Sequence, residues 1–179
     1  MTAYKFLAKG AVGPISGYVW PSPRGDEPGA WVEVDGPLTL CSQGLHLCRT
    51  FDLVYWLHDE LWDAESSGER VEGIDCIMVR RARLVRRIDA WNEGGAARFA
   101  DACVEHAASQ ATSASSDVRE FIADAKLAAN HGYVAVSAFS AALAVAKLSP
   151  AIENERAFRR ERRWQADWIT RELIAPQSP

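Results

Sequence analysis

The chain is organised around residues 39–57, which read TLCSQGLHLCRTFDLVYWL. Two cysteines, Cys41 and Cys48, enclose a glycine turn and His46. Because alternate side chains of an extended segment share a face, we expect His46 and Cys48 to point the same way. Thr50 or Asp52 can cap a helix, and the apolar side chains that follow recur at helical spacing. The stretch therefore predicts a strand that leads directly into a helix near residues 51–60.

The composition is that of an ordinary globular protein. Of the 179 residues 48% are hydrophobic, which suffices for one domain or for one domain with a helical extension. The net charge of −4 does not favour nucleic acid or an acidic membrane surface as a partner. Residues 1–7 lack the features of a signal peptide, and the apolar run at 133–148 is interrupted by serines. We expect a cytoplasmic protein with reduced cysteines and no membrane partner.

Short strands are predicted throughout the first half of the chain. Apolar segments bounded by glycine, proline and turn residues mark them at residues 4–8, 15–20, 31–34, 61–65 and 75–88. The sequence Ser66-Ser67-Gly68-Glu69 predicts a turn after the fourth segment. Arginines on both faces of the last segment predict a bulge or a strand end near Arg80.

From Trp91 the sequence is alanine-rich and its pattern is helical. Helices are predicted at about residues 96–110, from Asp117 onward, at 133–148 and from Pro150 to Pro176. The apolar sequence at 133–148 indicates the central helix of this half. Asp117 and Glu120 have the spacing of a capping box, and Gly132 suits a left-handed helix end. These patterns predict an α+β protein. Residues 1–90 form a twisted, mostly antiparallel sheet with one helix, and residues 91–179 form an antiparallel helical bundle packed on it in one compact unit.

The loop in residues 39–57 carries the first candidate site. Cys41, His46 and Cys48 are candidate zinc ligands because thiolate and imidazole bind this metal, and His58 or Asp63 is available as a fourth ligand. The alternative is a buried strand with two core cysteines and a histidine bonded to the backbone. A further interpretation makes His46 and Cys48 catalytic residues, with the thiol as nucleophile. No cofactor is predicted from these patterns, and zinc is the candidate that the loop leaves open.

The arginine run from Arg80 to Arg87 is the second candidate site. Guanidinium groups bind phosphate, and tryptophans can line a ligand pocket. The candidate ligand-binding residues are Trp56, Trp62, Arg81 and Arg83.

A second arginine group lies on the last predicted helix, and it consists of Arg156, Arg159, Arg160, Arg162 and Arg163. If both groups faced one way, they would form an anion-binding surface. The acidic composition of the chain favours the alternative, in which these arginines pair with carboxylates such as Glu153, Glu155 and Glu161.

Two resemblances accompany these motifs. The loop Gly44-Leu45-His46-Leu47-Cys48 and the ending Glu161-Arg162-Arg163-Trp164-Gln165 with Trp168 resemble a family of uncharacterised bacterial proteins, for which the resemblance implies no activity. The same loop, followed by an aromatic helix and a strand, is similar in outline to the split sheet of ADP-ribosyltransferases. Residues 4–8 lack the histidine or arginine with which such enzymes hold NAD, so this resemblance implies a related sheet and not the activity.

The patterns leave three hypotheses for function. The first is a binding or interaction protein of a bacterial conflict or regulatory system, whose partner is another protein or a second copy of the chain. The second is a small enzyme with a site around His46 and Cys48 that acts on a nucleotide-like or phosphorylated ligand. The third is nucleic-acid binding through the run from Arg80 to Arg87, which the acidic composition does not favour. The first is preferred because no complete catalytic set is recognised.

Overall fold

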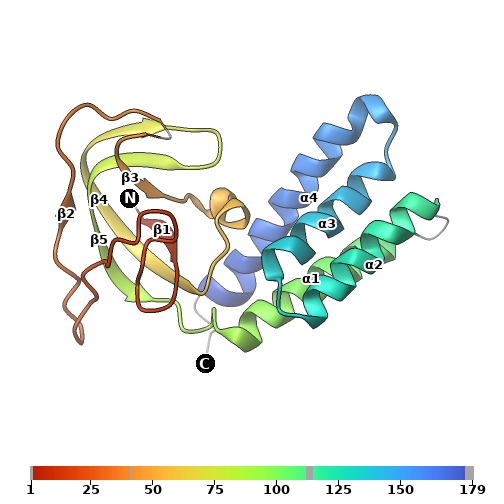
Figure 1. Cartoon of the computed structure of the whole chain (residues 1–179), viewed down its shortest axis with the longest axis horizontal. Helices are drawn as coiled ribbons and strands as arrows, with labels where there is room; N and C mark the ends of the chain where they lie inside the picture. Colours follow the sequence, from red (N-terminus) through yellow and green to blue (C-terminus); the bar gives the residue numbers. More distant parts are fainter. Residues whose placement is uncertain (1, 41, 112–114, 176–179) are drawn as a thin grey trace. The chain divides into compact units, whose positions relative to one another are not determined.

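The computed structural model describes residues 2–40, 42–111 and 115–175, and it confirms the α+β class (Figure 1). The chain divides into a sheet unit, Met1–Asn92, and a helical unit, Glu93–Pro179. None of the described helices combines the length and the apolar composition that crossing a bilayer requires.

The sheet unit is built on one antiparallel sheet of five strands, in which β4 and β5 form the long central hairpin (Figure 1). The strand order is β1-β4-β5-β2, and β3 pairs with β5. The strands are β1 (Thr2–Leu7), β2 (Val32–Glu33), β3 (Leu45–Leu47), β4 (Glu60–Glu72) and β5 (Ile77–Arg87). Tyr4 and Cys48 exchange backbone hydrogen bonds of 2.8 and 2.7 Å, which join the end of β3 to β1. The pairings β1-β4-β5-β3-β1 therefore form a closed ring.

The turn predicted at residues 66–69 is wrong, because β4 continues through it to Glu72. The register between β4 and β5 shifts between Ser67 and Arg70, so that Gly68 and Glu69 lie opposite the single residue Arg80. Gly68 has a φ of +79°, a conformation that glycine adopts without strain. The turn-forming residues thus produce a bulge instead of a chain reversal, and the irregularity expected near Arg80 is confirmed.

Two further sequence predictions need correction in this unit. Residues 15–20 form no strand: Ile15 is 88% exposed, and the segment pairs with residues 11–13 through an isolated bridge between Val12 and Val19 and a few backbone hydrogen bonds. The predicted helix at 51–60 is the shorter 3₁₀ helix η1 (Thr50–Tyr55). It ends there because the Trp56 indole is held by the Asp75 carbonyl, and the next residues lead directly into β4.

The helical unit contains four α-helices and two short helical turns in its described residues. They are α1 (Glu93–Gln110), α2 (Ser116–Asn130), α3 (Val134–Lys147), η2 (Ala151–Glu153), α4 (Asn154–Ile169) and the π-helical turn η3 (Thr170–Ile174). Buried alanines of α3 let α1, α2 and α4 pack around it, which confirms its central position. Gly132 adopts the expected positive φ of 73°.

The helix starts differ from the prediction in two places. α2 is capped by Ser115, whose hydroxyl accepts from the Val118 N–H, and not by Asp117. α4 starts at Asn154, because the residues after Pro150 first form the separate turn η2. Pro176, the predicted end of the last helix, lies outside the described residues.

Candidate functional site

His46 and Cys48 lie at the end of β3, where this strand meets β1. Cys48 is buried, and burial raises the pKa of its thiol well above the ordinary value, with nearby carboxylates adding to the effect. Burial lowers the pKa of His46, and the positive charge of Lys5 lowers it further. Both effects favour the uncharged forms, whereas a nucleophilic cysteine requires a stabilised thiolate.

Lys5 is the charged residue of this region that sequence analysis missed. Its Nζ donates a 2.7 Å hydrogen bond to the His46 carbonyl and lies 4.7 Å from the centre of the Trp20 ring. Burial lowers the pKa of Lys5 to about 8. The signal was present in the sequence, because Lys5 alternates with Ala3 and Leu7, which both belong to the buried core.

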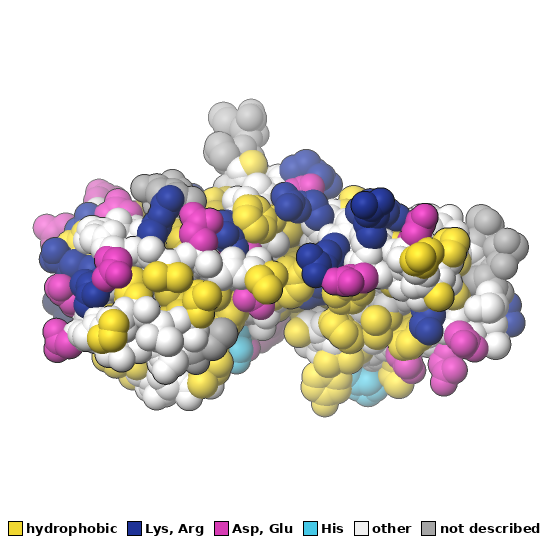
Figure 2. Space-filling model, turned by 90° about the horizontal axis from the view of Figure 1, so that it is seen from above, with side chains coloured by type: hydrophobic (Ala, Val, Ile, Leu, Met, Phe, Trp, Pro, Cys, Tyr) yellow, Lys and Arg dark blue, Asp and Glu magenta, His cyan; other side chains and the backbone are white. Residues whose placement is uncertain are grey.

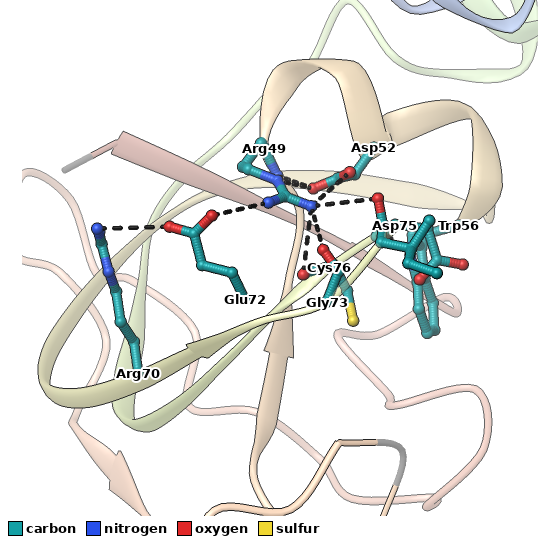
Figure 3. A network of polar contacts seen from close by, with 9 residues as sticks. Arg49, Asp52, Trp56, Arg70, Glu72, Gly73, Asp75 and Cys76 are labelled. Carbon is teal, nitrogen blue, oxygen red and sulfur yellow. Dashed lines mark hydrogen bonds and ion pairs between the residues drawn. The ribbon is translucent and has the colours of Figure 1, made fainter. Parts of the chain in front are cut away.

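Hydrogen bonds and ion pairs of Arg49 join the segment after Cys48 to the turn between β4 and β5 (Figure 3). Its guanidinium bonds both carboxylate oxygens of the buried Asp52, at 2.6 and 3.1 Å, and donates to the Gly73 carbonyl at 2.8 Å. It also pairs with Glu72 at 3.2 Å. Trp56 donates to the Asp75 carbonyl of the same turn at 2.7 Å (Figure 3). These bonds satisfy a buried carboxylate and fix the position of η1, so this network stabilises the fold.

The proposed metal ligands come together only in part. Cys41 lies outside the described residues. Among the residues that the structure describes, no three histidine, cysteine, aspartate or glutamate side chains are grouped as a metal ion requires. His58 Nδ1 accepts from the Asp59 N–H at 2.9 Å, and Asp63 forms an ion pair with Arg86 at 2.6 Å, so both suggested fourth ligands have other partners.

Every arginine in the run from Arg80 to Arg87 forms an ion pair with a carboxylate. The pairs are Arg80–Glu69, Arg81–Glu33, Arg83–Glu65, Arg86–Asp63 and Arg87–Glu60. The guanidiniums of Arg81 and Arg83 each lie 4.6 Å from the centre of the Trp31 ring. The buried Trp62 donates its indole N–H to Glu60 at 3.2 Å. The charge of this run is therefore largely balanced by its own surroundings.

The outward side of α4 presents a different group of arginines, which we call the arginine face. It consists of Arg156, Arg159, Arg160 and Arg163, together with Ile152 and Trp164. These residues, with Glu155 and Asp167, line an open hollow of about 810 Å³. Dark-blue and yellow side chains lie next to one another over the helical unit in Figure 2. Arg159 pairs with Glu155, but among the described residues no carboxylate lies within ion-pair distance of Arg156 or Arg160.

The expected pairing of Glu161 with the arginines of α4 is wrong. Glu161 is only 3% exposed and lies 2.9 Å from His106 Nδ1 of α1, whose ring stacks on Trp164 at a centroid distance of 3.6 Å. Burial raises the pKa of Glu161, and the hydrogen bond from His106 opposes this effect. Arg162 is also buried and donates to Gln165 at 2.8 Å. The predicted group thus separates into core residues and the exposed arginine face.

Comparison of the chain with family models, curated proteins and solved structures finds no match of any of the three kinds. Sequence analysis identified the arginines of α4 but not the part played by Ile152, which is 95% exposed beside them. The exposure of Ile152 comes from the structure and has no signal in the sequence.

Proposed function

We propose that the protein is a cytoplasmic binding protein that docks a partner protein on the arginine face of α4. The observation that carries this proposal is the state of Arg156 and Arg160, which are exposed and have no carboxylate partner among the described residues. Elsewhere the same chain pairs its clustered arginines with carboxylates, as the run from Arg80 to Arg87 does. Guanidiniums that are left without a carboxylate on a helix face are suited to receive acidic groups from another molecule.

A protein partner fits this surface better than nucleic acid does. The hollow combines the arginines with Ile152 and Trp164, and arginine and tryptophan are the residues that most often anchor protein interfaces. Glu155 and Asp167 also line it, so the surface carries both signs of charge, which suits a protein segment with acidic and basic residues better than a uniformly negative phosphate backbone.

Retention on two immobilised polyanions tests the proposal. We expect the protein to bind poly-L-glutamate, to elute from double-stranded DNA at lower salt than from poly-L-glutamate, and to lose retention on poly-L-glutamate in the double variant Arg156→Glu with Arg160→Glu. The matched control is Arg98→Glu with Lys126→Glu, which changes the net charge equally at exposed positions of α1 and α2. Equal retention of both variants would refute the proposal, and stronger retention on DNA would favour the nucleic-acid hypothesis.

A further inference from the structure

We infer that the partner segment that docks on the arginine face is an amphipathic acidic helix, which lies along α4 with its carboxylates opposite the arginines. This inference rests on the proposed function and adds the secondary structure and the charge pattern of the ligand. The expected ligand is a helix of a partner protein. The test below can instead show binding of an extended acidic segment or of nucleic acid.

The spacing of the arginines is the first argument. Arg156, Arg160 and Arg163 occupy positions i, i+4 and i+7 of one helix, so they share a face and span about 10 Å along its axis. Carboxylates at i, i+4 and i+7 of a second helix have the same spacing. Three carboxylates on one face of a strand span about 13 Å, because same-side residues of a strand are separated by about 6.6 Å. A helix therefore matches all three arginines, whereas a strand loses register after two.

The apolar residues at the two ends of the arginine face are the second argument. Ile152 lies one turn before Arg156 and is 95% exposed, and Trp164 directly follows Arg163. The Trp164 ring is held in place by its stack on His106, which is itself fixed by Glu161. A rigid aromatic wall loses little conformational freedom when a partner binds, which favours affinity. The partner helix is thus expected to carry apolar residues on both sides of its acidic residues.

Two carboxylates line the hollow, one at each end of the arginines. Glu155 precedes Arg156 and pairs with Arg159, and Asp167 follows Arg163 by one turn. A basic residue of the partner helix placed opposite Asp167 complements this end of the arginine face.

Binding of synthetic peptides by fluorescence anisotropy tests the inference. The first peptide is an alanine-rich helix of about 20 residues, long enough to form helix in water, with glutamates at i, i+4 and i+7, a lysine one turn later and flanking leucines. The second has the same composition with the glutamates on different faces. At about 50 mM salt, where exposed charges are weakly screened, we expect the first peptide to bind at least about tenfold more tightly than the second.

A charge exchange tests the register directly. The double variant Arg156→Glu with Arg160→Glu should bind the first peptide at least about tenfold more weakly and should regain affinity for a version with lysines in place of the glutamates. The control Arg98→Glu with Lys126→Glu should bind like the wild type. Circular dichroism of both variants shows whether the helices are intact.

The outcomes separate the inference from the proposed function. If both peptides bind equally and the charge reversal weakens both, the helix is refuted while an acidic protein partner is retained. If DNA of equal charge is bound more tightly than either peptide, both the helix and the proposed protein partner are refuted. Preferential binding of the in-register peptide, with recovery in the charge exchange, supports both.

Discussion

Replacing Lys5 by methionine should stabilise the sheet unit at pH 7. Lys5 extends from β1 on the same face as Ala3 and Leu7, and its amine donates to the His46 carbonyl and lies over the Trp20 ring. Methionine keeps an unbranched chain of similar length and removes the charge that burial disfavours. The change thus tests whether this lysine lowers the stability of the fold.

The size of the effect follows from the pKa of Lys5. Burial lowers it to about 8. Against a value of about 10.4 in the unfolded chain, this corresponds to about 3 kcal/mol of destabilisation at neutral pH. Losing the hydrogen bond to the His46 carbonyl subtracts about 1 kcal/mol. We therefore expect Lys5→Met to raise the free energy of unfolding by about 2 kcal/mol at pH 7.

The pH dependence has a definite sign. Between pH 8 and about 10.4 the unfolded amine is protonated while the folded amine is mostly neutral, so the unfolded state binds more protons. The stability contributed by this group in the wild type therefore rises with pH across that window. The advantage of Lys5→Met should be nearly complete at pH 7 and lost above about pH 10.5, where the hydrogen bond to the His46 carbonyl leaves the wild type slightly the more stable.

Urea unfolding followed by tryptophan fluorescence measures this difference, with Lys9→Met as the control at an exposed position of the same unit. The difference between wild type and variant is the quantity to compare at pH 7 and pH 10.5, because other titrating groups contribute equally to both proteins. A loss of stability at pH 7, or a difference that is the same at both pH values, would refute the reasoning.

Two further predictions concern the surroundings of the same loop. Arg49→Ala removes the guanidinium that neutralises the buried Asp52 carboxylate, which then keeps only the backbone N–H of residue 49, and should lower the free energy of unfolding by about 3 kcal/mol in urea titrations. Arg70→Ala, which removes an exposed ion pair with Glu72, should cost less than about 1 kcal/mol. Equal losses would show that the contacts of Arg49 stabilise the fold no more than an exposed ion pair does. Burial raises the pKa of the Cys48 and Cys103 thiols, so iodoacetamide near pH 8 should alkylate both roughly a hundredfold more slowly in the folded protein than in urea. Mass spectrometry measures the two rates. Fast alkylation of Cys48 in the folded protein would support the nucleophile hypothesis instead.

Local patterns predicted the helical half of the fold better than the sheet. The apolar run at 133–148 and Gly132 define α3 and its start, because helix boundaries depend on nearby residues. Residues 66–69 have turn chemistry, yet the strand pairing of β4 with β5 absorbs Gly68 as a bulge. Whether Gly68 forms a bulge or a turn depends on pairing with β5, and the sequence of residues 66–69 alone does not contain this information.

At the candidate sites, too, local positions were predictable from the sequence and contacts between distant segments were not. An extended segment that contains His46 and Cys48 was predicted from their spacing, and the structure has His46 in β3 and Cys48 in the bridge to Tyr4 directly after it. The state of Lys5 did not follow, because its surroundings come from Trp20 and His46, far along the chain. The contacts of His106 with Glu161 and Trp164 likewise join α1 to α4 across more than fifty residues.

The contrast between the two arginine groups explains why the proposed binding surface is on α4. In the sheet, Arg83 and Arg86 lie directly across from Glu65 and Asp63, so strand pairing itself brings each charge to its partner. On α4, Glu155 pairs with Arg159, and Glu161 turns inward to His106. Among the described residues no carboxylate lies within ion-pair distance of Arg156 or Arg160. The same contact of His106 fixes the Trp164 ring beside these arginines, which are available to an acidic partner.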